Sequence, residues 1–534
     1  MPAARNVLRK SCLVAVALLL VEGFAERACG QDIEALAERL ERLERQNRDL
    51  ERQVEEKLRE QAATSPVNAD GGIDATTVES IVAGYLQRQA EAKKKEEAKK
   101  SEFVEVGGDL NFKTTWKDGV NFATPNNDFK FHFGGRLQLD MGRFDETDTF
   151  PTFDDAVGFR RARLKADGTM WEVFDWVTEF DFSNNGAVAD RATFMDVYVE
   201  FTQLPAVGNI RVGRFKEPVA FEELISDNYI SLMERSSAAQ AFVPSRNLGV
   251  MLHRTWGDQQ RATSAFGWFR DDTGESIDPA KGNGDFGQGE AEYALDARLT
   301  YLPVWEHDGR CLVHVGGSYS RRNFNTNADA ATNRPRLRVN APIRLGTPFL
   351  LDTGAIADVE SVNLCGGELA AQRGPLNFQS DIYLYQLNRL AKNGGDLASP
   401  LYWGGYVQVG YFLTGEHRPY KRSAGAFDRV RPHGNFFFVR GEDGSLQRGM
   451  GAWELVARYG YLDLHSSGFA TDPTDATRVG GTGVLQDITL GVNWYLNPNL
   501  KWQFNWVRCY RDSDGGPAFD GHVDIWAARL VLDF

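Results

Sequence analysis

Apolar and polar residues alternate along most of the chain from about residue 103 onward. In residues 130–141 (KFHFGGRLQLDM) the odd positions hold the apolar side chains and the even positions hold the polar ones. A two-residue period places all apolar side chains on one face of a β-strand. The same alternation returns in segments of about ten residues separated by Gly-, Asn- and Asp-rich turns, for example in 174–182, 293–301 and 453–461. The pattern therefore predicts a large all-β protein.

The number of these segments and the charges on their polar faces favour a membrane barrel. About seventeen candidate strands lie between residues 104 and 534, and single-chain bacterial barrels use an even number of strands. We expect the candidate near Val104 to lie outside the barrel, which leaves about sixteen. Charges would be unfavourable in the dry core of a sandwich but fit a water-filled lumen. We predict a transmembrane antiparallel barrel over residues 103–534, closed by a last strand that ends at Phe534.

The N-terminal segment differs in composition from the barrel. Residues 1–30 combine a basic start with a short apolar stretch at 13–21, which is typical of a secretory signal peptide. Small residues at 23–25 and at 28–30 mark two alternative cleavage sites for the signal peptidase. The leader predicts export through the inner membrane.

Residues 31–60 carry a heptad pattern that predicts a short α-helical coiled coil. Its seam follows a 3-4 spacing through Ile33, Leu36, Leu40, Leu43, Asn47, Leu50 and Val54. A solitary amphipathic helix on a surface is the alternative, but the narrow seam favours association of several chains. Residues 61–102 read as a linker followed by a charged helix.

Composition and motifs argue against several classes of protein. The net charge is −14, which disfavours nucleic-acid binding. The five cysteines have no CxxC spacing, and the chain has no HExxH, GxSxG or phosphate-loop motif. We therefore expect no catalytic residue, no metal and no cofactor, although a barrel enzyme with a Ser and a His on its wall stays open as a third hypothesis.

A segment of about thirty residues, 217–246, interrupts the regular strand pattern. A loop this long in a regular barrel is usually functional, and folding it inward would narrow the pore. An ordinary extracellular loop is the alternative. Two other long gaps, 322–359 and 415–451, read as outer loops. The charged residues that we expect in a constriction loop are Glu222, Glu223, Asp227, Glu234 and Arg235.

Four segments together resemble the phosphate-selective porin O and P family of outer-membrane porins. These segments are 129–144 (FKFHFGGRLQLDMGRF), 159–164 (FRRARL), 209–215 (NIRVGRF) and 366–375 (GGELAAQRGP). The resemblance covers roughly residues 104–534. It implies a sixteen-stranded trimeric barrel whose third loop folds inward, with arginines and a lysine that handle phosphate.

The resemblance also assigns individual residues. Arg136, Arg160 and Arg161 stand where the family places pore arginines, and Ser226 stands at a serine of its binding site. The alternation adds Arg163 to the basic stripe on the lumen face. The family's loop lysine falls on Glu223 in this chain. A carboxylate at that place predicts weak anion selectivity.

These observations predict a homotrimeric porin in the outer membrane, in contact with its lipid. We expect it to pass small hydrophilic solutes and inorganic ions by passive diffusion, anions such as phosphate among them. The alternative is a structural envelope anchor whose coiled coil binds the cell wall or a periplasmic protein.

Overall fold

The structure, a computed structural model, describes the chain from residue 106 onward with several gaps. The predicted signal peptide, coiled coil and charged helix therefore lie outside the described residues. None of the helices in the described ranges is long and apolar enough to cross a membrane. The described residues are 106, 110–147, 153–183, 192–270, 291–324, 335–345, 347–354, 356, 359–389, 399–440, 444–465, 482–513 and 520–534.

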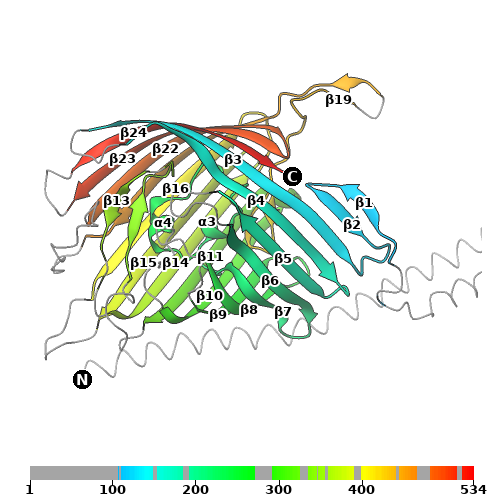
Figure 1. The fold of residues 1–534 in the computed structure, drawn as a ribbon, viewed down its shortest axis with the longest axis horizontal. Helices are drawn as coiled ribbons and strands as arrows, with labels where there is room; N and C mark the ends of the chain where they lie inside the picture. The colour runs from blue at the N-terminus through cyan, green and yellow to red at the C-terminus, as the bar shows by residue number, and fades with distance from the viewer. Residues whose placement is uncertain are drawn as a thin grey trace, which may run out of the picture. The chain divides into compact units, whose positions relative to one another are not determined.

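Sixteen antiparallel strands in the described part of the chain close into a barrel, each paired with its neighbour in sequence (Figure 1). The strands are β3 (Lys130–Glu146), β4 (Ala156–Met170), β5 (Phe174–Asp181), β6 (Thr193–Leu204), β7 (Gly208–Lys216), β8 (Arg246–Trp256), β9 (Ala262–Arg270), β10 (Ala291–Glu306), β11 (Cys311–Phe324), β14 (Val359–Arg373), β15 (Leu376–Arg389), β16 (Leu401–Phe412), β21 (Ala452–Asp463), β22 (Gly483–Asn497), β23 (Leu500–Ser513) and β24 (Gly521–Asp533). β24 pairs with β3, with Trp526 opposite Arg143, and this pairing closes the ring. The predicted barrel and its strand number are confirmed.

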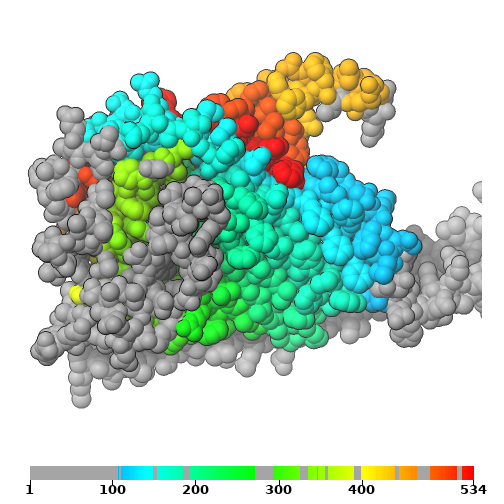
Figure 2. Space-filling model, in the orientation of Figure 1, coloured from blue at the N-terminus to red at the C-terminus, as the bar shows by residue number. Residues whose placement is uncertain are grey.

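Two short strands, β1 (Lys113–Trp116) and β2 (Val120–Ala123), form a hairpin outside the ring. β2 pairs with the first residues of β3, where Val120 lies opposite Phe133. The hairpin extends the wall beyond the end of the barrel, as Figure 2 shows in blue. The sequence had suggested one extra strand nearer Val104, and the structure has two slightly later in the chain.

The alternation places apolar side chains outward and polar side chains inward, as a membrane barrel requires. On β10, Leu299 and Tyr301 are half exposed or more, whereas the alternate residues Asp296, Arg298 and Thr300 are buried inside. The assignment of the odd positions of 131–141 to the outer face agrees with the exposure of Phe133 and Leu137 there.

The connections divide the barrel into two ends. Short turns at 171–173, 205–207 and 374–375 share one end with the C-terminal Phe534, and we call it the short-turn end. The 413–451 segment links β16 to β21 and therefore also lies at the short-turn end. Its interpretation as an outer loop was wrong, because its Gly-, Asn- and Arg-rich composition marks a loop without saying at which end of an antiparallel barrel the loop lies.

Loop segments pack inside the barrel on one side. At the opposite, long-loop end, helix α4 (Ser237–Phe242) and the hairpin of β12 (Arg338–Asn340) and β13 (Phe349–Asp352) share an apolar core with the inner faces of β14–β16 and β21–β24. Helix α3 (Phe221–Leu224) packs against a hairpin from the short-turn end, β17 (Tyr420–Lys421) and β18 (Ala426–Phe427). A further hairpin, β19 (Val439–Arg440) and β20 (Leu446–Gln447), projects from the short-turn end (Figure 2).

Candidate functional site

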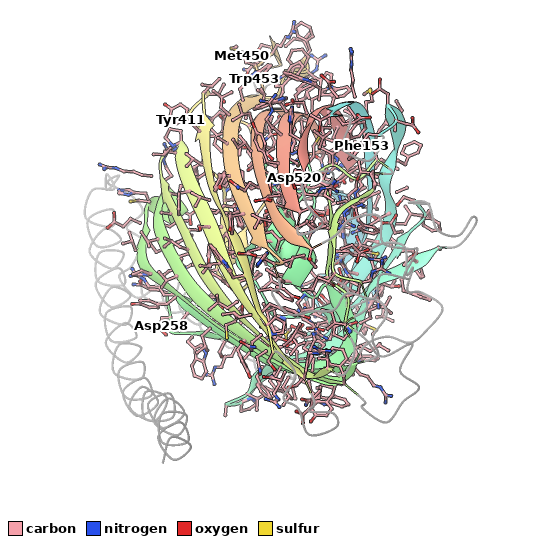
Figure 3. The ribbon with its side chains drawn as sticks, turned by 90° about the vertical axis from the view of Figure 1, so that its left-hand side faces the viewer. Phe153, Asp258, Tyr411, Met450, Trp453 and Asp520 are labelled. Atoms are coloured by element: carbon pink, nitrogen blue, oxygen red, sulfur yellow. The ribbon has the colours of Figure 1, made fainter. Side chains whose placement is uncertain are left out.

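The connection between β7 and β8, residues 217–245, crosses the lumen (Figure 3). The Ser231 hydroxyl donates to the Glu454 carboxylate on β21 over 3.0 Å. The Ser237 hydroxyl donates to the Asp487 carboxylate on β22 over 2.7 Å. Because these strands lie across the barrel from β7 and β8, the loop divides the lumen. We call residues 217–245 the inward loop.

Local interactions within the inward loop fix its two short helices. The Ser236 hydroxyl caps α4 by accepting from the Ala239 amide over 3.2 Å. The Glu222 carboxylate in turn accepts from the amide and the hydroxyl of Ser236, at 3.0 and 2.7 Å. Gly404 on β16 permits α4 to lie against the wall, since a Cβ there would be 3.0 Å from the Ala238 Cβ. Glu222 therefore holds the loop together internally.

Asp227 ties the inward loop to the first two barrel strands. Its carboxylate lies near four guanidinium groups, at 3.9 Å from Arg136, 3.2 Å from Arg161, 3.2 Å from Arg163 and 2.7 Å from Arg235. Burial alone would raise the pKa of Asp227, but Arg161 and the other guanidinium groups lower this pKa well below its usual value. Asp227 is therefore an anion at any physiological pH.

Glu234 forms a second junction between the inward loop and the wall. Arg160 donates to both of its carboxylate oxygens, at 2.7 and 3.1 Å. Arg529 on β24 donates to the same carboxylate over 2.7 Å and to both oxygens of Asp140, at 2.6 and 2.7 Å. Burial would raise the pKa of Glu234, but Arg160 and Arg529 lower it well below its usual value. Arg529 could not be singled out from the sequence, because its partners Asp140 and Glu234 lie far away in the chain.

A β-bulge in β4 explains why two successive arginines both face inward. Gln138 pairs with Arg161, and the next residue, Leu139, pairs with Phe159, so that Arg160 is the extra residue. Both Arg160 and Arg161 are buried. A plain alternation would have directed one of them to the outer face, and the bulge has no clear signal in the sequence.

Glu223, which stands where the resemblance implies a lysine, has two cationic neighbours. Its carboxylate oxygens lie 2.9 Å from the Arg235 Nε and 3.4 Å from the Lys216 Nζ. The Ser245 hydroxyl also donates to it, over 3.2 Å. The negative charge at this position is therefore balanced locally. Lys216, the last residue of β7, was not singled out from the sequence.

The predicted arginines of β3 and β4 thus meet Asp227, Glu234 and Arg235 where the inward loop joins these strands, whereas Glu222 lies 3.3 Å from Arg458 on β21. Arg136 donates to Glu179 on β5 over 2.8 Å, and Arg163 donates to Asp181 over 2.7 Å. Ser226 is partly exposed, and its hydroxyl accepts from the Asn228 amide over 3.4 Å.

A hollow of about 1060 Å³ lies between the inward loop and the wall on the side of β4–β9. Its boundary on the inward loop is formed by Pro218 and Leu224, and its boundary toward the short-turn end is formed by residues 421–424. Seven basic and four acidic side chains line it: Lys130, Lys165, Arg211, Lys216, Arg254, Arg298 and Lys421, and Asp167, Asp175, Asp196 and Glu200.

The hairpin of β17 and β18 packs against the inward loop on the side that faces the short-turn end. Arg298 on β10 donates to the Gly425 carbonyl over 2.9 Å. The Phe427 ring lies 5.5 Å from that of Phe221 in the inward loop. Arg429 donates to the Tyr229 hydroxyl over 3.0 Å. We did not predict from the sequence that this hairpin enters the barrel. The apolar residues within an otherwise polar segment were the available signal for it.

A closed barrel of sixteen strands, apolar outside, charged inside and crossed by one of its own loops, defines an outer-membrane porin. The family model "Phosphate-selective porin O and P" matches residues 131–534, and the chain belongs to this family. The protein is therefore a channel of the cell outer membrane. Short turns of barrels of this kind face the periplasm, which places the short-turn end there.

The chain is also similar to individual proteins and solved structures. Porin O of Pseudomonas aeruginosa is 28% identical over 444 residues, which cover 80% of this chain and 93% of that protein. A protein of Caulobacter vibrioides is 29% identical over 427 residues, 79% of this chain and 77% of its own length. Among solved structures, OmpF of Salmonella typhi in complex with daunomycin has a TM-score of 0.45 at 12% identity, covering 79% of this chain and 100% of that chain. DcaP of Acinetobacter baumannii has a TM-score of 0.44 at 10% identity, covering 77% and 99%.

Proposed function

We propose that small anions, phosphate among them, diffuse through the hollow on the β4–β9 side with a modest preference over cations. The observation that carries this proposal is the excess of basic over acidic side chains around the hollow, in a chain whose net charge is −14. A passage lined by an excess of one sign of charge raises the local concentration of ions of the opposite sign.

The preference is modest because most of the charges around the hollow are paired. Lys165 lies 3.0 Å from Asp167, and Arg211 lies 2.6 Å from Glu200. Lys421 is exposed on the periplasmic hairpin and makes no ion pair within the described residues. Salt bridges cancel much of the field of their members, so the unpaired cations set the sign of the preference.

Within this proposal, the inward loop is the constriction and the arginines around Asp227 and Glu234 hold it in place. The burial of Arg160 and Arg161 and their pairing with loop carboxylates support this role over direct contact with a solute. The balanced environment of Glu223 supports anion passage despite the carboxylate at this position.

We also propose that the porin assembles as a homotrimer. The heptad pattern of residues 31–60 supports association, because a coiled coil requires more than one chain.

Charge reversal at the hollow tests the proposed selectivity. In planar bilayers under a gradient of potassium chloride, we expect the wild-type reversal potential to indicate anion preference. Lys421→Glu should shift the anion-to-cation permeability ratio toward cations by roughly two- to fivefold in about 0.1 M salt, where screening is incomplete.

Lys113→Glu is the matched control for this experiment. Lys113 is an exposed lysine on β1, outside the ring of the barrel, and its reversal should leave the ratio unchanged. Cation preference in the wild type, or equal shifts in both variants, would contradict the proposal.

A further inference from the structure

Residues 436–450 form an arm outside the ring of strands at the short-turn end. The arm consists of the β19–β20 hairpin and the residues on either side of it, and β21 follows it in the chain. Figure 2 shows the arm in orange-yellow beyond the edge of the barrel wall. In the view of Figure 3, turned by 90°, Met450 also lies outside the ring. The arm therefore extends sideways past the wall.

Hydrogen bonds fix the root of the arm to the outer edge of β21 and β22. The Phe436 amide donates to the Leu496 carbonyl on β22 over 2.8 Å. At the other end of the arm, the Met450 carbonyl accepts from the indole N–H groups of Trp453 and Trp494, at 3.3 and 3.0 Å. Because both ends are held by the barrel, the barrel sets the direction in which the arm extends.

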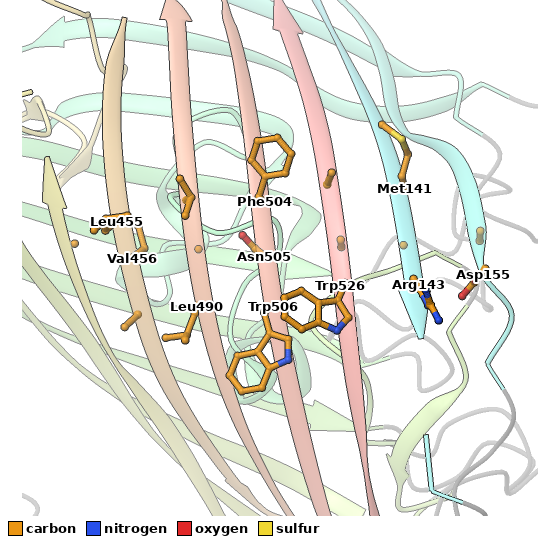
Figure 4. A pocket seen from close by; sticks show the side chains of 18 of the residues that line it. Met141, Arg143, Asp155, Leu455, Val456, Leu490, Phe504, Asn505, Trp506 and Trp526 are labelled. Atoms are coloured by element: carbon orange, nitrogen blue, oxygen red, sulfur yellow. The ribbon is translucent and has the colours of Figure 1, made fainter. Parts of the chain in front are cut away.

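The root of the arm continues an aromatic border of the outer wall. Figure 4 shows Leu455 and Leu490 on the apolar outer face of β21 and β22. At the periplasmic end of this face, the rings of Trp453 and Trp494 stack with 5.1 Å between their centroids. Aromatic residues at this level form the girdle of a membrane barrel, where the wall meets the lipid headgroups. The Phe436 ring packs edge-on against Trp494 at 4.7 Å.

The arm exposes large apolar side chains beyond this girdle. Phe438 is 68% exposed and Met450 is 72% exposed, and Phe437 and Leu446 are exposed as well. Apolar side chains that gather on a surface mark a contact with a protein or with a membrane. The arm thus carries an apolar surface that nothing within the described residues covers.

Two arginines accompany the apolar side chains. The Arg448 guanidinium lies over the rings of Phe436 and Phe438, at 4.5 and 5.5 Å from their centroids, and Arg440 is exposed on β19. Neither arginine makes an ion pair within the described residues. The acids of the arm, Glu442 and Asp443, lie midway along it in the sequence, whereas the arginines lie nearer to the root. Aromatic side chains beside arginines are typical of segments that lie in a membrane interface.

We propose that the arm lies on the periplasmic leaflet of the outer membrane. Its sideways direction at the level of the girdle favours lipid over a soluble protein of the periplasm, since the wall beside it already meets lipid there. Interfacial segments bury their apolar face about 5–10 Å into the boundary between headgroups and acyl chains. Phe437 and Phe438 would occupy that depth, with Arg440 and Arg448 at the anionic headgroups. This contact is independent of the proposed ion selectivity.

Quenching by spin-labelled lipid tests this proposal on the protein in vesicles of phosphatidylethanolamine and phosphatidylglycerol. In a background without native cysteines, Gln447→Cys on β20 carries an environment-sensitive fluorophore. Gln259→Cys is the matched control, because Gln259 is an exposed glutamine on the short turn between β8 and β9. With a spin label on the upper acyl chain, we expect roughly twofold or stronger quenching at position 447 and much weaker quenching at position 259.

A second test removes the apolar side chains of the arm. Replacing both Phe437→Ser and Phe438→Ser in the labelled Gln447→Cys protein should reduce the quenching to the level of the control. Trp116→Ser removes an exposed aromatic ring from the β1–β2 hairpin instead and should leave the quenching unchanged. An unchanged single-channel conductance in each variant shows that the barrel is intact.

Several outcomes would overturn the proposal. Weak quenching at position 447 with water-like emission would leave the arm in the periplasm, free for a soluble protein. Weak quenching with emission that is already shifted to the blue in detergent would assign the arm to a second copy of the chain. Equal quenching at positions 447 and 259, or quenching that persists in the double serine variant, would show that the arm makes no lipid contact of its own.

Discussion

The lumen has two sides: on one, loop segments cover the inner face of the barrel wall, and on the other, the inner face lines a hollow. On the packed side, the inner faces of β14–β16 and β21–β24 carry apolar residues, such as Tyr385, Leu462 and Leu485, which are fully buried against α4 and the β12–β13 hairpin. On the passage side, β4–β9 present charged residues, such as Lys165 and Arg211, to the hollow. The comparison shows that an inward face need not be polar: where a loop covers it, its residues follow the rules of a dry core.

The largest expected effect comes from releasing the inward loop, which separates the two sides, from the barrel wall at Asp227. Asp227→Asn removes the charge that four guanidinium groups share, and loss of one partner in a buried ionic cluster costs about 3–5 kcal/mol. The inward loop should then leave its position. We expect a larger and noisier single-channel conductance in planar bilayers.

Asp258→Asn is the control for this change. Asp258 is exposed on a short turn, so its loss should leave the conductance as it is. If Asp227→Asn conducts like the wild type, the loop is not held by this cluster.

A cavity on the packed side should have the next largest effect. Leu485 is fully buried in the apolar core, and Leu485→Ala should lower the free energy of unfolding by about 2–5 kcal/mol. Leu299→Ala on the outer face of β10 loses side-chain burial in lipid but leaves no cavity, so its cost should be smaller. Urea unfolding in lipid vesicles measures both, and equal costs would show that the packed side is not a dry core.

The smallest effect is expected from moderate acid. Because the pKa values of Asp227 and Glu234 are lowered well below their usual range, the stability that these groups contribute is fully present above their unfolded values. It is lost only as the pH falls through the lowered folded values. The open-channel noise, which reports on movement of the inward loop, should therefore stay constant from about pH 8 to about pH 4. An increase in this noise near pH 5 would show that other groups hold the loop.

The sequence predicted the barrel because alternation is a local property that each strand carries on its own. The closing strand ending at Phe534 and the apolar outer faces follow from the same pattern. The ion pairs could not be predicted, because Asp227 meets Arg161 and Glu234 meets Arg529 only after the chain has closed. The bulge at Arg160 depends on pairing with β3, and the end at which the 413–451 segment lies depends on counting every earlier strand correctly.

Two matched threonines test most directly whether ions pass on one side of the lumen. Thr263 on β9 lines the hollow, whereas Thr489 on β22 is buried on the packed side. In a background without Cys311, Cys365 and Cys509, each threonine is replaced singly by cysteine and exposed to a negatively charged thiol reagent in a planar bilayer. We predict that the reagent reduces the conductance of Thr263→Cys and leaves that of Thr489→Cys unchanged. Block of Thr489→Cys, or of neither variant, would contradict a passage on the β4–β9 side.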